Sequence, residues 1–154
     1  MEITKRIRDI ISKTIHIEGG LVDNPKDPGG LTNHGISQRA FPKLDIRNLT
    51  FEQAIQIGYD HYWTPGNLSS YTNDGYAWKC FEIVFNMGSQ SLTLLGLGVM
   101  PGNEDTDAGT EDLIQGMLVR YDLLVEHKKN DEIFLKGWDN RAKMKYTIGE
   151  TYDS

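Results

Sequence analysis

Isoleucines recur near the start of the chain at the spacing of an amphipathic helix. Polar and charged residues separate them, and they stand at Ile3, Ile7, Ile10, Ile11 and Ile15. Side chains three and four residues apart share one face of an α-helix, so this stripe predicts a helix that packs on a core. We expect the helix to end at Gly19–Gly20, because glycine readily takes the left-handed conformation that caps a helix.

Residues 21–37 have the composition of a loop or a short β-hairpin. They include Asn24-Pro25 and Asp27-Pro28-Gly29-Gly30. Proline cannot continue a helix, and the glycine pair favours tight turns. Such loops are exposed and commonly carry chemistry, so this region is the first place to look for a site.

The rest of the chain is mainly helical in pattern. A capping box at Thr50-Phe51-Glu52-Gln53 begins a helix that runs to Tyr62–Trp63. Apolar periodicity predicts further helices near residues 75–87, 89–95, 113–125 and 134–141, with a loop over 96–107. No repeat or low-complexity linker interrupts this pattern. We expect one mainly α domain over residues 1–154, with a frayed tail after Tyr146.

Charge and hydropathy narrow the classes of partner. The chain has a formal net charge of −6 and no dense run of lysine or arginine, which disfavours binding to nucleic acid. No apolar stretch approaches the roughly 20 residues that span a bilayer, and residues 1–17 alternate charge with isoleucine instead of forming a secretory signal. We expect no membrane insertion, and transport by another factor if the substrate lies outside the cytoplasm.

Potential metal ligands do not follow a recognisable metal motif. The histidines include no His-x-x-x-His pair; they are His16, His34, His61 and His127. The run Asn103-x-Asp105-x-Asp107 resembles part of a calcium loop, but Ile114 stands where such a loop has its bidentate glutamate. We expect no metal and no cofactor. Cys80, within an apolar helical stretch, is predicted to be a buried thiol.

Glu18 has the surroundings that a glycosidase acid requires. It stands at the predicted end of a helix, where the helix dipole is negative and disfavours a carboxylate. The adjacent Gly19-Gly20 leaves room for a bulky substrate. An acid that keeps its proton beside open space can protonate a leaving oxygen. From the pattern alone, a solvated residue at a helix end is an equally good interpretation of Glu18.

Asp27 and Thr32 are candidates for the other half of such a reaction. Glycosidases commonly use a second carboxylate as a nucleophile or as a base that activates water. Asp27 follows Glu18 by nine residues and can supply it, and the Thr32 hydroxyl can hold the attacking water. Asp27 is also the residue type that forms Asx turns. The separation of the carboxylates, and hence retention or inversion, is left open by the sequence.

The run from Glu18 to Ser37 resembles the start of glycoside hydrolase family 108. The matching residues are Glu18-Gly19-Gly20-Leu21-Val22-Asp23-Asn24-Pro25, Asp27-Pro28-Gly29-Gly30, Thr32 and Gly35-Ile36-Ser37. The similarity continues at Ala54, Tyr59, Tyr62-Trp63, Phe81 and Asn86-Met87-Gly88, and closes at Phe134-Leu135-Lys136-Gly137-Trp138-x-Asn140-Arg141. It covers roughly residues 7–141.

This resemblance implies an α+β lysozyme-like fold and a muramidase. Residues 1–95 would form a catalytic half, and residues 96–146 a helical half similar to a peptidoglycan-binding region, although residues 96–107 match only loosely. In the family the glutamate of the Glu-Gly-Gly motif is the catalytic acid, and the wider phage-lysozyme order falls on Glu18, Asp27 and Thr32. The substrate would be the β-1,4 bond between N-acetylmuramic acid and N-acetylglucosamine.

The resemblance also implies a biological setting. The family includes phage endolysins and secretion-associated lysozymes. We therefore expect a monomer that is made in the host cytoplasm and reaches the cell wall through a separate pore or secretion system. Two alternatives stay open: an inactive peptidoglycan-binding protein, and a zinc-dependent amidase that uses His16, His34 and Asp27.

Further residues are candidates for binding the glycan. Tyr62, Trp63, Tyr71 and Tyr76 have rings that can stack on sugars, although aromatic residues at a helix end are more often part of the core. Asn86 follows an apolar helix, and a buried amide there would need a partner such as an acetamido group. His34 stands where the resemblance leads us to expect a tyrosine or another aromatic residue, which would alter a cleft wall.

Overall fold

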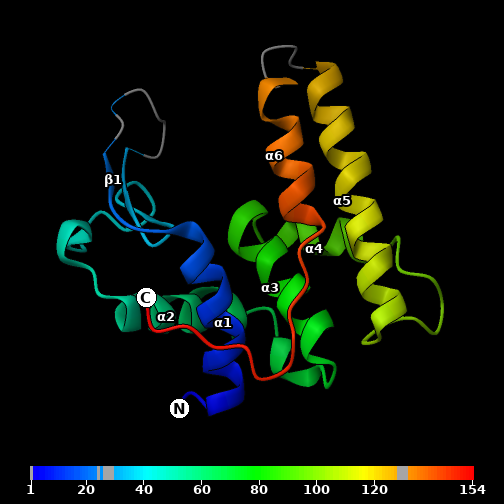
Figure 1. The fold of residues 1–154 in the computed structure, drawn as a ribbon, viewed down its shortest axis with the longest axis horizontal. Helices are drawn as coiled ribbons and strands as arrows, with labels where there is room; N and C mark the ends of the chain where they lie inside the picture. The colour runs from blue at the N-terminus through cyan, green and yellow to red at the C-terminus, as the bar shows by residue number, and fades with distance from the viewer. Residues whose placement is uncertain (1, 24, 26–29, 128–131) are drawn as a thin grey trace. The chain divides into compact units, whose positions relative to one another are not determined.

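The protein divides into two compact units. The structure, a computed structural model, describes residues 2–23, 25, 30–127 and 132–154 (Figure 1). Unit 1 comprises Met1–Ser69 together with Gly149–Ser154, and unit 2 comprises Ser70–Ile148. This boundary does not coincide with the expected division at residue 95, because the helices on both sides of that position pack within unit 2.

Unit 1 begins with the predicted amphipathic helix, α1 (Lys5–Glu18). The Thr4 side chain caps it by accepting a hydrogen bond from the Ile7 amide at 3.2 Å. The isoleucine stripe faces the core, and the side chains of Ile10, Ile11 and Ile15 are fully buried. The helix ends where expected, because Gly19 has a φ of 79° and its amide donates to the His16 carbonyl at 3.2 Å.

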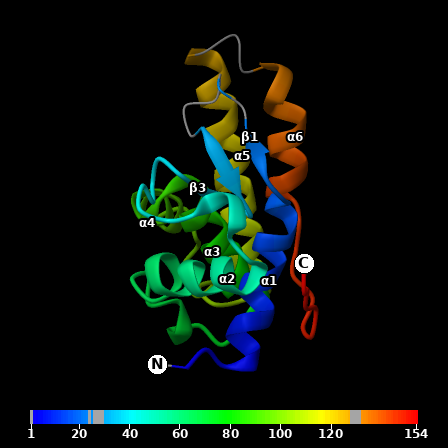
Figure 2. The same ribbon diagram turned by 90° about the vertical axis from the view of Figure 1, so that its left-hand side faces the viewer.

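A small antiparallel sheet follows α1. Its strands are β1 (Val22–Asp23), β2 (Leu31–Asn33) and β3 (Ile36–Ser37), and they lie in the order β1-β2-β3 (Figure 2). Thr32 pairs with Val22 on one side and with Ser37 on the other. His34 and Gly35 connect β2 to β3 with φ values of 53° and 81°. Two consecutive positive φ angles are typical of a type I′ hairpin turn. The hairpin region predicted after the first helix is thus confirmed.

The remaining elements of unit 1 complete its core. A 3₁₀ turn η1 (Ile46–Asn48) leads to α2 (Phe51–Gly58), which begins with the predicted capping box between Thr50 and Gln53. Instead of continuing as an α-helix to Trp63, the chain widens into a π-helical turn, η2 (Tyr59–Trp63). A short 3₁₀ helix, η3 (Leu68–Ser70), follows.

The last residues of the chain pack against α1, contrary to the frayed tail expected after Tyr146. The Tyr152 amide donates to the Ser12 hydroxyl at 3.0 Å, and the Arg8 guanidinium donates to the Tyr152 carbonyl at 3.1 Å. The Lys13 ammonium pairs with the Glu150 carboxylate at 3.0 Å. We call residues 149–154 the C-terminal strap. Its partners lie on a helix more than a hundred residues away in sequence, which local pattern does not reveal.

Unit 2 is helical throughout its described elements. They are α3 (Asp74–Met87), α4 (Ser89–Gly96), α5 (Asp107–His127) and α6 (Glu132–Ala142). Helices α5 and α6 lie side by side in both views (Figures 1 and 2). Each of these helices was predicted, and the fold is α+β and mainly helical, as expected. None of the described helices combines the length and apolarity needed to cross a membrane.

Helix α3 carries most of the core of unit 2. Cys80 is fully buried, as predicted, and burial raises the pKa of its thiol to about 12. Lys79 is also fully buried, and its ammonium donates to the Ala142 carbonyl at 2.7 Å. The buried Glu82 carboxylate pairs with Arg141 at 3.2 Å. These two contacts fix the end of α6 to α3, because a buried charge that lost its partner would be costly.

Side chains hold the loop that joins α4 to α5, residues 97–106, in place. The Asp105 carboxylate accepts hydrogen bonds from the Thr72 amide and hydroxyl and from the Asn73 amide, all between 2.8 and 3.0 Å. The Asp112 carboxylate accepts from the Met100 amide at 2.9 Å and from Asn103 Nδ2 at 3.0 Å. The acidic run that resembled a calcium loop therefore uses Asp105 to bind backbone amides.

We predict that Gly109→Ala destabilises unit 2 by about 1–3 kcal/mol, because an added Cβ would overpack this loop. That Cβ would lie 2.1 Å from the Asn103 carbonyl oxygen. The matched control is Gly137→Ala in α6, where a Cβ would meet nothing within 4 Å. It should raise stability by up to about 1 kcal/mol through helix propensity. Urea denaturation of the two variants measures both effects, and equal stabilities would contradict the packing described here.

Candidate active site

Glu18 is the last residue of α1, and its side chain is half-buried. Gly19 and Gly20 follow it, and a Cβ built on either glycine would meet nothing within 4 Å. The carboxylate therefore stands at a helix terminus beside open space. This is the arrangement that the sequence predicts for an acid that a bulky substrate can approach.

The final turns of α1 are held by the C-terminal strap. The ring of Tyr152 stacks on that of His16 with a centroid distance of 4.1 Å and an interplanar angle of 16°. One turn earlier, Lys13 is paired with Glu150. Because His16 precedes Glu18 by two residues, these contacts limit the motion of the backbone that carries the acid.

Thr32 lies in the middle strand of the sheet, between β1 and β3. Its side chain is half-buried, and its hydroxyl donates to the Gly30 carbonyl at 3.5 Å. A hydrogen bond of this length is weak, so the hydroxyl can turn toward a water molecule at little cost. Asp27, the candidate second carboxylate, lies outside the described residues.

A buried side-chain amide next to Thr32 fixes the sheet to the rest of unit 1. Asn33 is only 6% exposed, and its Nδ2 donates to the Ile46 carbonyl at 2.9 Å and to the Leu49 carbonyl at 3.3 Å. His34 occupies the adjacent turn, and its ring meets Phe51 edge-on at a centroid distance of 5.7 Å. The predicted cleft-wall residue His34 is thus a half-buried turn residue that packs on α2.

The two aromatic residues at the end of η2 have different surroundings. Trp63 is fully buried, and its Nε1 donates to the Ser69 hydroxyl at 2.8 Å. This burial favours the alternative that Trp63 is part of the core over its assignment as a stacking platform. Tyr62 is half-buried, and burial raises the pKa of its hydroxyl.

Asn86, in unit 2, is exposed, whereas we expected a buried amide. Its side-chain amide donates to the Glu82 carbonyl at 2.9 Å and to the Glu82 carboxylate at 3.1 Å. It also lines a cavity of about 360 Å³ together with Tyr121, Trp138 and Arg141. The Tyr121 and Trp138 rings are 5.4 Å apart and come from α5 and α6. Sequence spacing did not reveal this pair, because it depends on how two helices pack.

Tyr71 and Tyr76 meet at another cavity of unit 2. Tyr76 is 3% exposed and Tyr71 is half-buried, and both line a cavity of about 400 Å³ beside the loop at residues 97–106. The structure therefore brings these two predicted residues together. Their surroundings are described further below.

The family of the chain follows from comparison with known proteins. The model of the family described as glycosyl hydrolase 108 matches residues 11–88, which include Glu18, all three strands, α2 and α3. The chain belongs to this family. It is therefore a glycoside hydrolase, and the family supports peptidoglycan as the polymer that it degrades.

Comparison of structures agrees with this assignment at the level of the fold. The structure of SagA from Brucella abortus matches with a TM-score of 0.66, covering 84% of this chain and 85% of that one at 23% sequence identity. At this identity the match shows a shared fold. Comparison with curated protein sequences gives no significant match.

We predict that Asn33→Ala lowers the free energy of unfolding by about 2 kcal/mol, since it removes the buried donor of the Ile46 and Leu49 carbonyls. Asn48→Ala is the control: Asn48 is exposed and donates only to Asp45 at 2.8 Å, so we expect less than about 0.5 kcal/mol. Thermal or urea denaturation measures both. A loss for Asn33→Ala no larger than that of the control would show that the sheet is held by other contacts.

Proposed function

We propose that the protein is an N-acetylmuramidase that hydrolyses the β-1,4 bond between N-acetylmuramic acid and N-acetylglucosamine in peptidoglycan. The observation that carries the proposal is the position of Glu18. This half-buried carboxyl group ends α1 beside two glycines that leave open space, within the segment that matches the glycosyl hydrolase 108 family. A glycan strand is bulky, and close approach of its backbone to an acid requires such space.

In the proposed reaction Glu18 acts as the general acid. It donates its proton to the glycosidic oxygen while the bond from that oxygen to the sugar C1 breaks, and the electron pair stays on the oxygen. Positive charge develops at C1. Asp27 stabilises this charge or takes a proton from the attacking water, and the Thr32 hydroxyl orients that water. Addition of water at C1 forms the new C1 hydroxyl, and the second proton of the water passes to a carboxylate, that of Asp27 or of Glu18. Proton exchange with solvent then leaves Glu18 protonated and Asp27 ionised for the next turnover.

For the biological setting we propose a phage endolysin, or a prophage-derived or secretion-linked enzyme with the same chemistry. The protein would act as a monomer, without a cofactor, and reach the wall through a separate pore or secretion system. The support for this setting is the resemblance of the Glu-Gly-Gly region to such muramidases. The biological setting can prove wrong without changing the assignment of Glu18 as the general acid.

We predict that Glu18→Gln reduces the release of reducing ends from purified peptidoglycan by about 10²–10⁴-fold, the usual contribution of a general acid. Glutamine keeps the shape of the side chain, but its amide cannot act as an acid. Glu126→Gln, which changes an exposed glutamate of α5, is the matched control for net charge and should retain full activity. Circular dichroism and melting temperature establish that both variants fold. Unchanged activity in Glu18→Gln would exclude Glu18 as the acid.

The products identify the bond that is cleaved. After borohydride reduction, a muramidase yields muramitol at the new chain ends, whereas glucosaminitol would indicate the other glycosidic bond. A 1,6-anhydro product without reducing ends would indicate internal transfer rather than hydrolysis. Release of free amino termini, lost on treatment with a chelator, would favour a zinc amidase. Binding without any product would favour an inactive peptidoglycan-binding protein.

We predict that Thr32→Val lowers kcat by on the order of 10²-fold, because the water would be poorly oriented. Thr32→Ser retains the hydroxyl and should keep most of the activity. Asp27→Asn should also lower kcat. Proton NMR of the first-formed anomer during hydrolysis distinguishes the two roles of Asp27, since a base that activates water on the opposite face inverts the configuration, whereas a carboxylate that stabilises the charge at C1 from that face leads to retention. Equal rates for the two Thr32 variants would remove the hydroxyl from the mechanism.

A further inference from the structure

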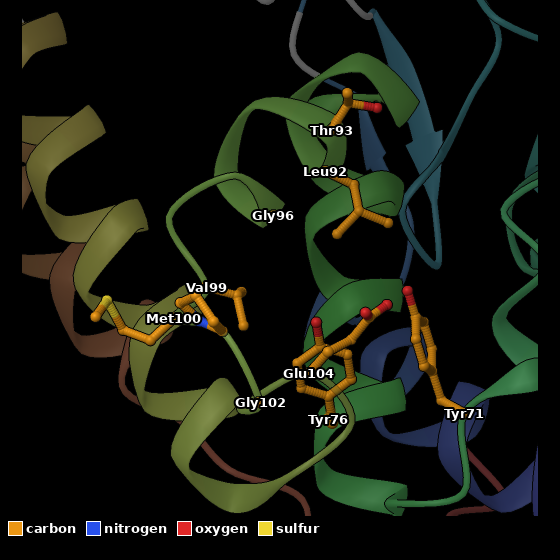
Figure 3. A pocket seen from close by; sticks show the side chains of 10 residues that line it. Tyr71, Tyr76, Leu92, Thr93, Gly96, Val99, Met100, Gly102 and Glu104 are labelled. Carbon is orange, nitrogen blue, oxygen red and sulfur yellow. The ribbon is translucent and has the colours of Figure 1, made fainter.

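The cavity beside the α4–α5 loop combines an acidic group with aromatic and apolar walls. It has a volume of about 400 Å³ and lies within unit 2 (Figure 3). The residues that define its chemistry are Tyr71, Tyr76, Leu92, Val99, Met100 and Glu104. In Figure 3 the Glu104 carboxylate and the Tyr71 hydroxyl point toward one another.

The two tyrosines form a corner of this cavity. Their ring centroids are 4.9 Å apart and the rings are inclined at 79°. Tyr76 is almost fully buried and is fixed by the core, whereas Tyr71 is half-buried and borders the solvent. Because the rings meet edge to face, no group fits between them, and the part of this corner that a ligand can reach is the half-buried Tyr71 ring. A cation held near a tyrosine face is attracted by the quadrupole of the ring.

The charge of the cavity is negative. Glu104 is exposed, and among the lining residues, all of which the structure describes, there is no lysine, arginine or histidine. Burial, together with the negative charges of Glu104 and Asp105, raises the pKa of the Tyr71 hydroxyl to about 12. The hydroxyl therefore stays protonated and uncharged at neutral pH, so Glu104 supplies the charge of the cavity. An anionic ligand would be repelled by such a cavity.

Glu104 stands on a backbone that is held in place on both sides before any ligand arrives. Its neighbour Asp105 binds the Thr72 and Asn73 amides, and its other neighbour, Asn103, donates to Asp112. Gly102, with a φ of 85°, supports the turn that precedes them. An ordered backbone reduces the conformational entropy that binding costs, so even an exposed carboxylate can contribute to affinity here.

We propose that this cavity binds an alkylammonium group, with its methylenes on Leu92, Val99 and Met100 and its charge beside Glu104 and the ring of Tyr71. The source of that ammonium group rests on the proposed function, in which peptidoglycan is the substrate. Where the diamino acid of the peptidoglycan stem peptide is lysine, its side chain ends in an ammonium group alone, whereas the acetylated sugars of the glycan strand carry no cation. The cavity would thus recognise a stem peptide of the polymer that the enzyme cleaves.

The test measures binding of synthetic probes to the full-length chain by isothermal titration calorimetry. The probes are a stem tripeptide with a free side-chain amine, the same peptide with that amine acetylated, and the free diamine cadaverine. We expect the free-amine peptide to bind about tenfold or more tightly than its acetylated form, and affinity to fall with added salt. Equal affinities for the two peptides would overturn the proposal. Stronger binding of cadaverine than of the peptide would overturn the stem peptide as the source.

Glu104→Gln provides the second arm. Because Glu104 is exposed, the variant should fold, and we expect it to bind the free-amine peptide about tenfold more weakly while its affinity for the acetylated peptide is unchanged. Glu126→Gln again controls for net charge and should bind like the wild type. A Glu104→Gln variant that binds both peptides like the wild type would overturn the proposal.

These outcomes are independent of those for Glu18. Hydrolysis with equal binding of the two peptides would contradict the ammonium site alone. Selective binding of the free-amine peptide without hydrolysis would contradict the muramidase assignment alone.

Discussion

The backbone conformation of Gly19 determines where α1 ends and therefore where Glu18 stands. A φ of 79° is strained for any residue with a Cβ, but glycine adopts it readily. The chain leaves the helix directly after Glu18 and continues into β1. Glu18 therefore stands in the C-terminal turn of the helix and not in its middle. Gly19 thus ends the helix, directs the chain to the sheet, and keeps the space beside the acid open.

Polar side chains that bind backbone groups fix the irregular parts of both units. Asn33 holds the sheet of unit 1 through two carbonyls, and Asp105 holds the α4–α5 loop of unit 2 through two amides. In each unit a candidate functional residue directly precedes this anchoring residue in the sequence: Thr32 precedes Asn33, and Glu104 precedes Asp105. Loops that carry function gain precision from such anchors, because a few ångströms of drift would separate reacting groups.

Features with local causes could be predicted from the sequence. The isoleucine stripe, the glycine stop after Glu18 and the Thr50 capping box each act within one or two turns of helix, and the structure contains all three. The candidate acid belongs to this group, since its place at a helix end follows from its neighbours. The α+β class and the family could also be inferred, because the Glu-Gly-Gly region has a distinctive motif.

Features that depend on distant packing could not be predicted. The pattern did not distinguish a surface ring from the buried Trp63, did not indicate that η2 widens into a π-helical turn, and did not reveal the strap on α1. The strap has a consequence for synthesis. Unit 1 is built from both ends of the sequence, with all of unit 2 between them. Glu18 and the sheet therefore leave the ribosome early. The strap, whose contacts complete their unit, is synthesised only after the whole of unit 2 has emerged and had time to fold.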